Sequence, residues 1–317
     1  MALVGVSAPR DLDERGRGLV AGVWAFRARS EREAASRFGR LAAQLEAEDA
    51  AAVVVAMAKR AEDDEVRHVE ICAGLAARYG HRGGAVASEP AGEIGPRGAG
   101  SRERLLYEVV AFCAVTESIN AALMTVSHER ATDPAVRSAV REILRDEVTH
   151  ARLGWAHLSA ERARGGGAGL AAALPAMLSG TVRDELFAPV NEASADPRLA
   201  GHGELPREVR VEVFTRTLES VVFPGLEAHG VDASSGRAWL ARARSGAPQR
   251  VADHALSSAH SRDPERSAWR RFLDASTGTT VAPTDLRPVT GSSGDPATPA
   301  AMECVPNGPS VHSSALA

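Results

Sequence analysis

Small and apolar side chains recur every three or four positions along most of residues 20 to 164. This period is typical of amphipathic helices, and it predicts four long ones. Their predicted ranges are 20–46, 49–79, 101–130 and 134–164. Asp133 before Pro134 is a capped helix start, and the glycines at 165–167 end the last helix.

The connections between these helices are short, long and short. Residues 80–100 are rich in glycine and proline and cannot continue a helix. An extended link of about 20 residues spans a helix of ~40 Å, whereas a short link joins antiparallel neighbours. Two hairpins joined by one long crossover therefore predict an all-α fold built on a four-helix bundle.

The helical period continues more loosely after the glycines. Further helices are predicted at 168–190, 206–229 and 236–273, packed on the bundle or against a partner subunit, which allows a homodimer. From residue 276 the chain is polar and rich in Pro, Ser, Thr and Gly, as in disordered tails. The predicted parts are an N-terminal extension (1–19), the bundle (20–164), a helical extension (165–275) and the tail (276–317).

Composition narrows the class of protein. Of 317 residues, 44% are hydrophobic and 25% are charged, and the net charge of -4 gives no reason to expect nucleic acid or an anionic membrane as a partner. The three cysteines are scattered without a C-x-x-C pair, which argues against a disulfide framework or an iron–sulfur cluster. We see no apolar run long enough for a signal peptide or a membrane span, so we expect a cytoplasmic protein.

Two copies of the motif E-x-x-H carry the candidate chemistry. Glu65 and His68 lie on the second predicted helix, and Glu147 and His150 lie on the fourth. A spacing of three residues places both side chains of a motif on one helix face, where a single metal ion can contact both.

The motifs interrupt apolar stripes. The stripe on the second helix is Val54, Ala58, Ala61, Glu65, His68, Cys72 and Leu75, and that on the fourth is Val140, Ile143, Glu147, His150 and Gly154. Burial of an unpaired carboxylate costs several kcal/mol, so these groups need a partner, and a metal ion is the natural one.

A bundle of this kind predicts one further inward carboxylate on each remaining helix. Glu117 is the only charged residue on the apolar stripe of the third helix. On the first helix, Glu31 lies on the stripe from Trp24 to Leu45, whereas Glu33 shares a face with arginines. Glu31 is the preferred ligand, and Glu33 stays open as the alternative.

The pattern E…E-x-x-H…E…E-x-x-H resembles the ferritin-like and rubrerythrin-like di-iron carboxylate superfamily, over about half of the chain. The resemblance implies two iron ions, with manganese or a mixed pair as the alternative. Glu31 and His68 would complete the coordination of one ion, and Glu117 and His150 that of the other. Glu65 and Glu147 would bridge the two ions. It also implies dioxygen or peroxide as a reactant and an external electron donor.

Four other residues near the motifs have less specific roles. His157 and His128 are expected to be hydrogen-bonded histidines near the bundle ends, with a role beside the metals as the alternative. Cys72 and Cys113 lie on inward stripes at different heights, so core packing is expected and a disulfide is not.

The expected function is a di-iron oxidase or oxygenase that activates dioxygen on a small organic substrate. The chain adds more than a hundred residues to the bundle and has no rubredoxin-like cysteine module, which favours a substrate pocket over iron storage or peroxide removal. A ferroxidase or peroxide-scavenging protein is the first alternative. A structural or binding protein stapled by metal is the second.

Overall fold

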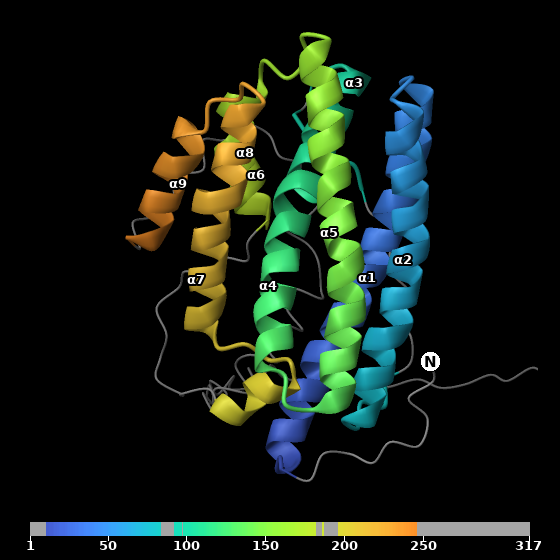
Figure 1. The fold of residues 1–317 in the computed structure, drawn as a ribbon, viewed down its shortest axis with the longest axis vertical. Helices are drawn as coiled ribbons and strands as arrows, with labels where there is room; N and C mark the ends of the chain where they lie inside the picture. The colour runs from blue at the N-terminus through green and yellow to red at the C-terminus, as the bar shows by residue number, and fades with distance from the viewer. Residues whose placement is uncertain (1–10, 84–91, 97, 182–185, 187–195, 246–317) are drawn as a thin grey trace, which may run out of the picture.

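A computed structural model describes residues 11–83, 92–96, 98–181, 186 and 196–245 of the chain (Figure 1). The described residues form helices and no strand, which confirms the all-α class. The α-helices are α1 (Glu14–Ala47), α2 (Ala52–Arg78), α3 (Ser101–Val109), α4 (Glu117–Arg130), α5 (Pro134–Ala163), α6 (Leu170–Thr181), α7 (Arg207–Thr217), α8 (Phe223–Ala228) and α9 (Ser234–Arg244). Two π-helical segments, η1 (Val110–Thr116) and η4 (Leu218–Val222), and a 3-10 helix, η3 (Pro197–His202), complete the set.

The four long helical segments lie side by side with their axes roughly parallel (Figure 1). α1 packs along α2 and α4 packs along α5, each pair forming an antiparallel hairpin, while α2 packs against α5 to join the hairpins. α1 and α4 make few close backbone contacts. α2 ends at one end of the bundle and α3 begins at the other (Figure 1).

The first helix starts earlier than its apolar pattern predicts, at Glu14 instead of near residue 20. Asp13 caps it, because its side chain accepts a hydrogen bond of 2.7 Å from the backbone N–H of Gly16. The first turn is polar and rich in glycine and therefore has no apolar period. The cap was the sequence signal for this start.

The third predicted helix is one rod made of α3, η1 and α4. The expectation that no apolar run reaches membrane-spanning length is wrong for Ser101–Arg130, which is long and apolar enough by length and composition. In the structure this rod packs against α5 and α7, and more than half of its most apolar window is buried. The core helix of a globular protein passes the same test.

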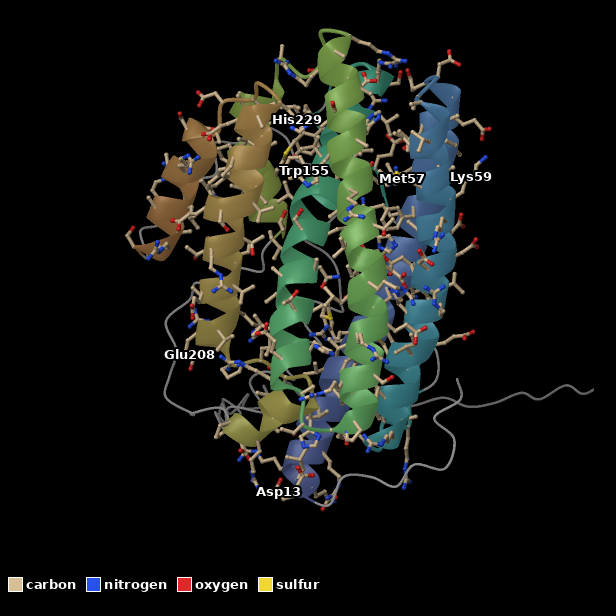
Figure 2. The ribbon with its side chains drawn as sticks, in the orientation of Figure 1. Asp13, Met57, Lys59, Trp155, Glu208 and His229 are labelled. Atoms are coloured by element: carbon tan, nitrogen blue, oxygen red, sulfur yellow. The ribbon has the colours of Figure 1, made fainter. Side chains whose placement is uncertain are left out.

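The helices after residue 165 cover one side of the rod. α6 packs on η1 and on α9, and α7 packs along α4 (Figure 1). The ring of Trp155 on α5 stacks on that of His229 at the end of α8, with centroids 5.9 Å apart (Figure 2). The parts of the predicted helices at 168–190 and 236–273 beyond α6 and α9, and the predicted tail, lie outside the described residues, apart from a single 3-10 residue at 186.

Candidate metal centre

Both E-x-x-H motifs and both lone glutamates face the interior of the bundle. The apolar stripes that carry them are buried along their length, as their period predicts. The exposed fractions of the six side chains are Glu31 8%, Glu65 1%, His68 0%, Glu117 3%, Glu147 0% and His150 1%. Carboxylates and imidazoles at this depth require compensating partners.

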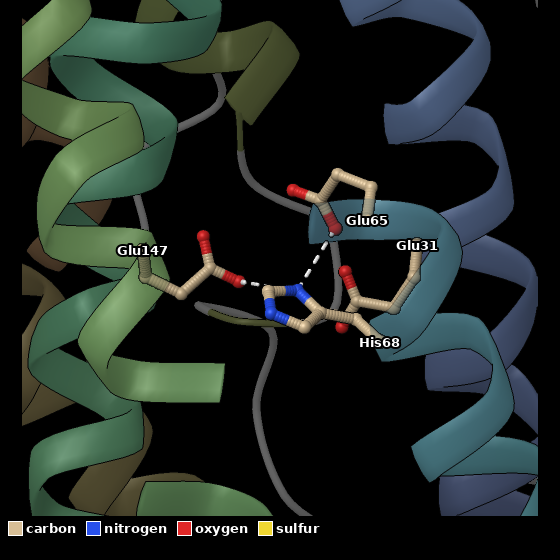
Figure 3. A group of neighbouring side chains, drawn as sticks. All are labelled: Glu31, Glu65, His68 and Glu147. Carbon is tan, nitrogen blue, oxygen red and sulfur yellow. Dashed lines mark hydrogen bonds and ion pairs between the residues drawn. The ribbon is translucent and has the colours of Figure 1, made fainter. Parts of the chain in front are cut away.

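The side chains of three helices meet in one cluster (Figure 3). Ligand atoms of Glu31, Glu65, His68 and Glu147 all lie within 4.8 Å of one another. The Nδ1 atom of His68 lies 3.1 Å from Glu65 and 3.9 Å from Glu147. This group could hold a metal ion.

His150 and Glu117 adjoin the same cluster. The Nδ1 atom of His150 lies 3.1 Å from Glu65 Oε1 and 3.2 Å from Glu147 Oε2. Glu117 is buried on α4, and its charge acts on Glu31 and Glu65. The structure therefore places His150 beside the cluster, with the buried Glu117 close enough to influence its charges.

Each histidine turns its other ring nitrogen towards an aspartate of the opposite motif. The Nε2 atom of His68 lies 3.2 Å from Asp146, and that of His150 lies 3.6 Å from Asp64. Both aspartates are buried and directly precede the motif glutamates. At His68, the Asp146 acceptor holds the N–H at Nε2 and leaves the Nδ1 lone pair facing the carboxylates, as in metal sites where a carboxylate orients a ligand histidine. The distance from His150 to Asp64 is too long for a hydrogen bond.

Arg67 ties the two aspartates together. Its guanidinium lies 2.9 Å from Asp64 and 2.6 Å from Asp146, and 3.4 Å from Glu142. These contacts link α2 to α5 directly beside the two histidines. The pattern D-E-x-x-H, present twice in the sequence, was the signal for this support, and our sequence analysis did not use it.

The four carboxylates cannot all be ionised without cations between them. Burial raises the pKa of Glu31 and of Glu117 well above the usual value, and the nearest glutamate adds to each shift. Burial and the Glu65 charge raise the pKa of Glu147 to about 7. Burial alone would lower the pKa of His150, but Glu147 and Glu65 raise it to about 11. Bound cations would replace these protons.

Two atoms of the cluster have no hydrogen-bond partner among the described residues. They are Glu65 Oε1, which lies close to His150 but without hydrogen-bond geometry, and His150 Nε2. A buried carboxylate oxygen without a donor is costly, and a metal ion would satisfy it. The donor set, four carboxylates and two imidazoles, fits hard to intermediate divalent metals such as iron and manganese.

A π-helical segment, η1, ends directly before Glu117. The Thr116 hydroxyl donates to the carbonyl of Ala111, five residues back, which matches the wider turn. One turn after Glu117, the amide of Asn120 donates to Glu147 at 2.9 Å. π-helical insertions are frequent at functional sites, and here one sets the register of Glu117. The apolar period of the sequence does not indicate this π-helical segment.

Glu31 and Glu33, the two candidate ligands of the first helix, lie in different environments. Glu31 lies in the cluster, whereas Glu33 is exposed and pairs with Arg37 at 3.3 Å. Cys72 and Cys113 are free and buried in separate core clusters, as expected.

The two other histidines lie outside the cluster. His157 is buried, but its Nε2 atom has no hydrogen-bond partner among the described residues, so the expected hydrogen bond of that atom is missing. His128 is half-buried in the last turn of α4.

Comparison with protein-family models, with curated proteins and with solved structures found no match. The fold and the cluster nevertheless define a class. The chain is an all-helical protein whose long helices enclose a buried group of glutamate and histidine side chains that could hold a metal ion. The arrangement of the ligand atoms in this group is the basis for the function proposed for the protein.

Proposed function

We propose that the protein is a non-haem di-iron oxidoreductase of the ferritin-like type that activates dioxygen on a small organic substrate. One observation carries this proposal. Two histidine Nδ1 atoms face the buried carboxylates of Glu65 and Glu147, with Glu31 in the same cluster, and Asp146 holds His68 from behind.

In this proposal Glu31 and His68 hold one iron ion, Glu117 and His150 hold the other, and Glu65 and Glu147 lie between them. Manganese or a mixed pair would suit the same donors. When bound, the metal pair supplies reduction of dioxygen, with electrons from a separate donor. The position of Glu65 supports its bridging role, because it adjoins both histidines.

The protein side chains orient the metal ligands and exclude water from the site. Asp146 holds the His68 ring in one tautomer, and Asn120 orients Glu147 through its amide. The ring of Phe38 lies 5.1 Å from the His150 ring, so an aromatic wall excludes water on that side. A low-dielectric interior strengthens every charge interaction within it.

The helices after the bundle support oxidation of an organic substrate over iron oxidation. α6 to α9 build a second apolar core against η1 and α4, next to Glu117. Iron oxidation alone does not require such a covering. A ferroxidase or a peroxide-scavenging protein is the alternative, and the experiment below separates the two.

Dioxygen uptake by protein loaded with two ferrous ions per chain tests this function. We expect uptake on loading, and sustained uptake when a reductant and a suitable substrate are supplied. Sustained uptake driven by excess ferrous ion alone would instead identify a ferroxidase. Glu65→Ala and His150→Ala should abolish metal loading and uptake together, and a variant that kept two irons would overturn the ligand assignment.

A further inference from the structure

One turn from the candidate metal centre, α1 carries a half-buried cation that forms no ion pair with a carboxylate of the described residues. Arg27 precedes Glu31 by four residues on α1, so it lies on the same helix face about 6 Å lower along the axis. It is half-buried, and its guanidinium donates to the thioether sulfur of Met124 on α4 at 3.2 Å. It also lies 5.2 Å from the centre of the Trp24 ring.

This guanidinium lies among the side chains of Trp24, Met124 and Cys72, and it also acts electrostatically on the carboxylate of Glu204. Arg27 acts electrostatically on the buried thiol of Cys72, one turn after His68 on α2. Cys72 and Met124 belong to the apolar core cluster directly below the metal centre. Thioethers and thiols are weak acceptors, and no carboxylate of the described residues forms an ion pair with Arg27. An uncompensated charge at such a site is costly.

A second arginine lies near the same place, from α7. Arg210 is half-buried, and its Nε atom is buried without a hydrogen-bond partner among the described residues. Arg210 and Arg27 both act on the carboxylate of Glu204, yet neither forms an ion pair with it. Glu204 supplies at most one negative charge for two guanidinium groups. Within the part of the chain that the structure describes, at least one positive charge is therefore left over.

The guanidinium of Arg27 lies about one helical turn from the candidate metal centre, along both α1 and α4. On α4, Asn120 bonds to Glu147, and Met124, one turn further along, accepts from Arg27. Asn120 and Arg27 are both partly accessible, whereas Met124 and Glu147 are buried. An anion at Arg27 therefore lies about one helical turn from the group that bonds to Glu147.

We propose that Arg27, with Arg210, binds the carboxylate of the substrate, and that the substrate is a small monocarboxylic acid. The planar guanidinium fork fits a carboxylate in bidentate fashion, and a single negative charge balances the remaining positive charge. The ~6 Å between Arg27 and the level of Glu31 corresponds to an acid of about four to six carbons. This inference names the substrate class of the proposed oxidoreductase and rests on that function for its catalytic meaning.

Calorimetric titration of the full-length protein with hexanoate and with hexanamide tests the site. Both the protein as purified and the chelator-treated protein are titrated. We expect hexanoate to bind at least tenfold more tightly than hexanamide in both forms. Arg27→Gln should lose at least tenfold in hexanoate affinity, Arg210→Gln should lose affinity to a smaller extent, and Arg27→Lys should lie between Arg27→Gln and the wild type.

Arg29→Gln is the matched control, because Arg29 lies on the same helix and, among the described residues, contacts the carbonyl of Ala25 and the ring of Phe26 and no residue of the proposed site. Its hexanoate affinity should equal that of the wild type, with all variants checked for helix content. Equal binding of hexanoate and hexanamide would overturn the proposal. So would hexanoate binding that needs the metal and is unchanged in Arg27→Gln, or an Arg27→Gln variant that loses only metal affinity.

The test separates this inference from the proposed function. Hexanoate binding by chelated protein does not depend on iron or dioxygen. A protein that binds hexanoate through Arg27 but never loads two metals would keep the carboxylate site and lose the oxidoreductase. A protein that loads two irons but does not bind hexanoate would keep the proposed oxidoreductase and lose the carboxylate site.

Discussion

Two glutamates two positions apart on α1 have opposite environments. Glu31 is 8% exposed and lies in the carboxylate cluster, whereas the side chain of Glu33 is 56% exposed. The difference follows from the helical period, since a step of two residues turns a side chain by about 200° around the axis. The apolar stripe on either side of Glu31 was enough to make this choice from the sequence.

We predict that Glu31→Gln lowers bound metal from two ions per chain to one or none, because an amide removes the anionic donor. Glu33→Gln should keep the metal content of the wild type, since it breaks only an exposed ion pair worth less than about 1 kcal/mol. Metal analysis of the two purified variants compares them directly. Loss of metal in Glu33→Gln with retention in Glu31→Gln would reverse the assignment.

His157 shows how burial shapes pH dependence. Burial lowers its pKa to about 4, so the folded protein keeps this imidazole neutral where the unfolded chain would protonate it. The contribution of the neutral His157 to the free energy of unfolding is fully present above pH 6.5 and is lost as the pH falls towards 4.

We predict that the wild type loses about 2 kcal/mol more than His157→Phe when the pH falls from 7 to 5. The measurement is urea unfolding at both pH values, with metal removed from both proteins. His128→Gln is the control, and it should follow the wild type. An equal loss in wild type and His157→Phe would show that His157 is solvated or paired in solution.

Among the structural elements, the contact between α5 and η1 is the tightest constraint near the site. A Cβ atom on Gly154 would lie 2.2 Å from the backbone nitrogen of Ala114 and 2.7 Å from its Cα. Gly154 follows His150 by one turn, and Ala114 precedes Glu117 by one turn. The glycine therefore sets the distance between the two helices that carry these candidate ligands.

We predict that Gly154→Ala destabilises the protein by about 1–3 kcal/mol or more, because backbone cannot move aside as a flexible side chain can. It should also weaken metal binding by separating Glu117 from His150. Gly18→Ala in α1 is the matched control, since a Cβ there meets nothing within 4 Å. It should be neutral or stabilising by up to about 1 kcal/mol. Similar effects of both substitutions would contradict the close contact.

The sequence predicted the elements well where the apolar period was long. The four bundle helices and the inward faces of all six candidate ligands followed from steps of three and four. The apolar period did not indicate the polar first turn of α1, the π-helical turn before Glu117 or the aspartates beside the histidines. Those features depend on caps, on backbone hydrogen bonds and on cross-helix contacts, none of which repeats with the helix.

At the scale of the whole molecule, the carboxylate cluster opposes folding unless cations or protons neutralise it. We predict that a divalent metal at 100 times its Kd stabilises the folded chain by about 2.7 kcal/mol. This corresponds to a rise in Tm of about 5–10 °C for a domain of this size. The measurement is thermal unfolding with and without ferrous or manganous ion under anaerobic conditions.

The double variant Glu65→Gln/Glu147→Gln should show no metal-dependent rise, because it lacks both central carboxylates. Glu33→Gln should respond as the wild type does. A rise in the double variant equal to that of the wild type would place the metal elsewhere on the chain.

The most direct test of the account is anaerobic titration of metal-free protein with ferrous ion, followed by air and absorption spectroscopy. A di-iron centre predicts saturation at two ions per chain and a new charge-transfer absorption after exposure to air. Saturation at zero or one ion, or a single tightly held zinc ion in the purified protein, would contradict a di-iron centre. The helical bundle would then stand as a structural or binding protein.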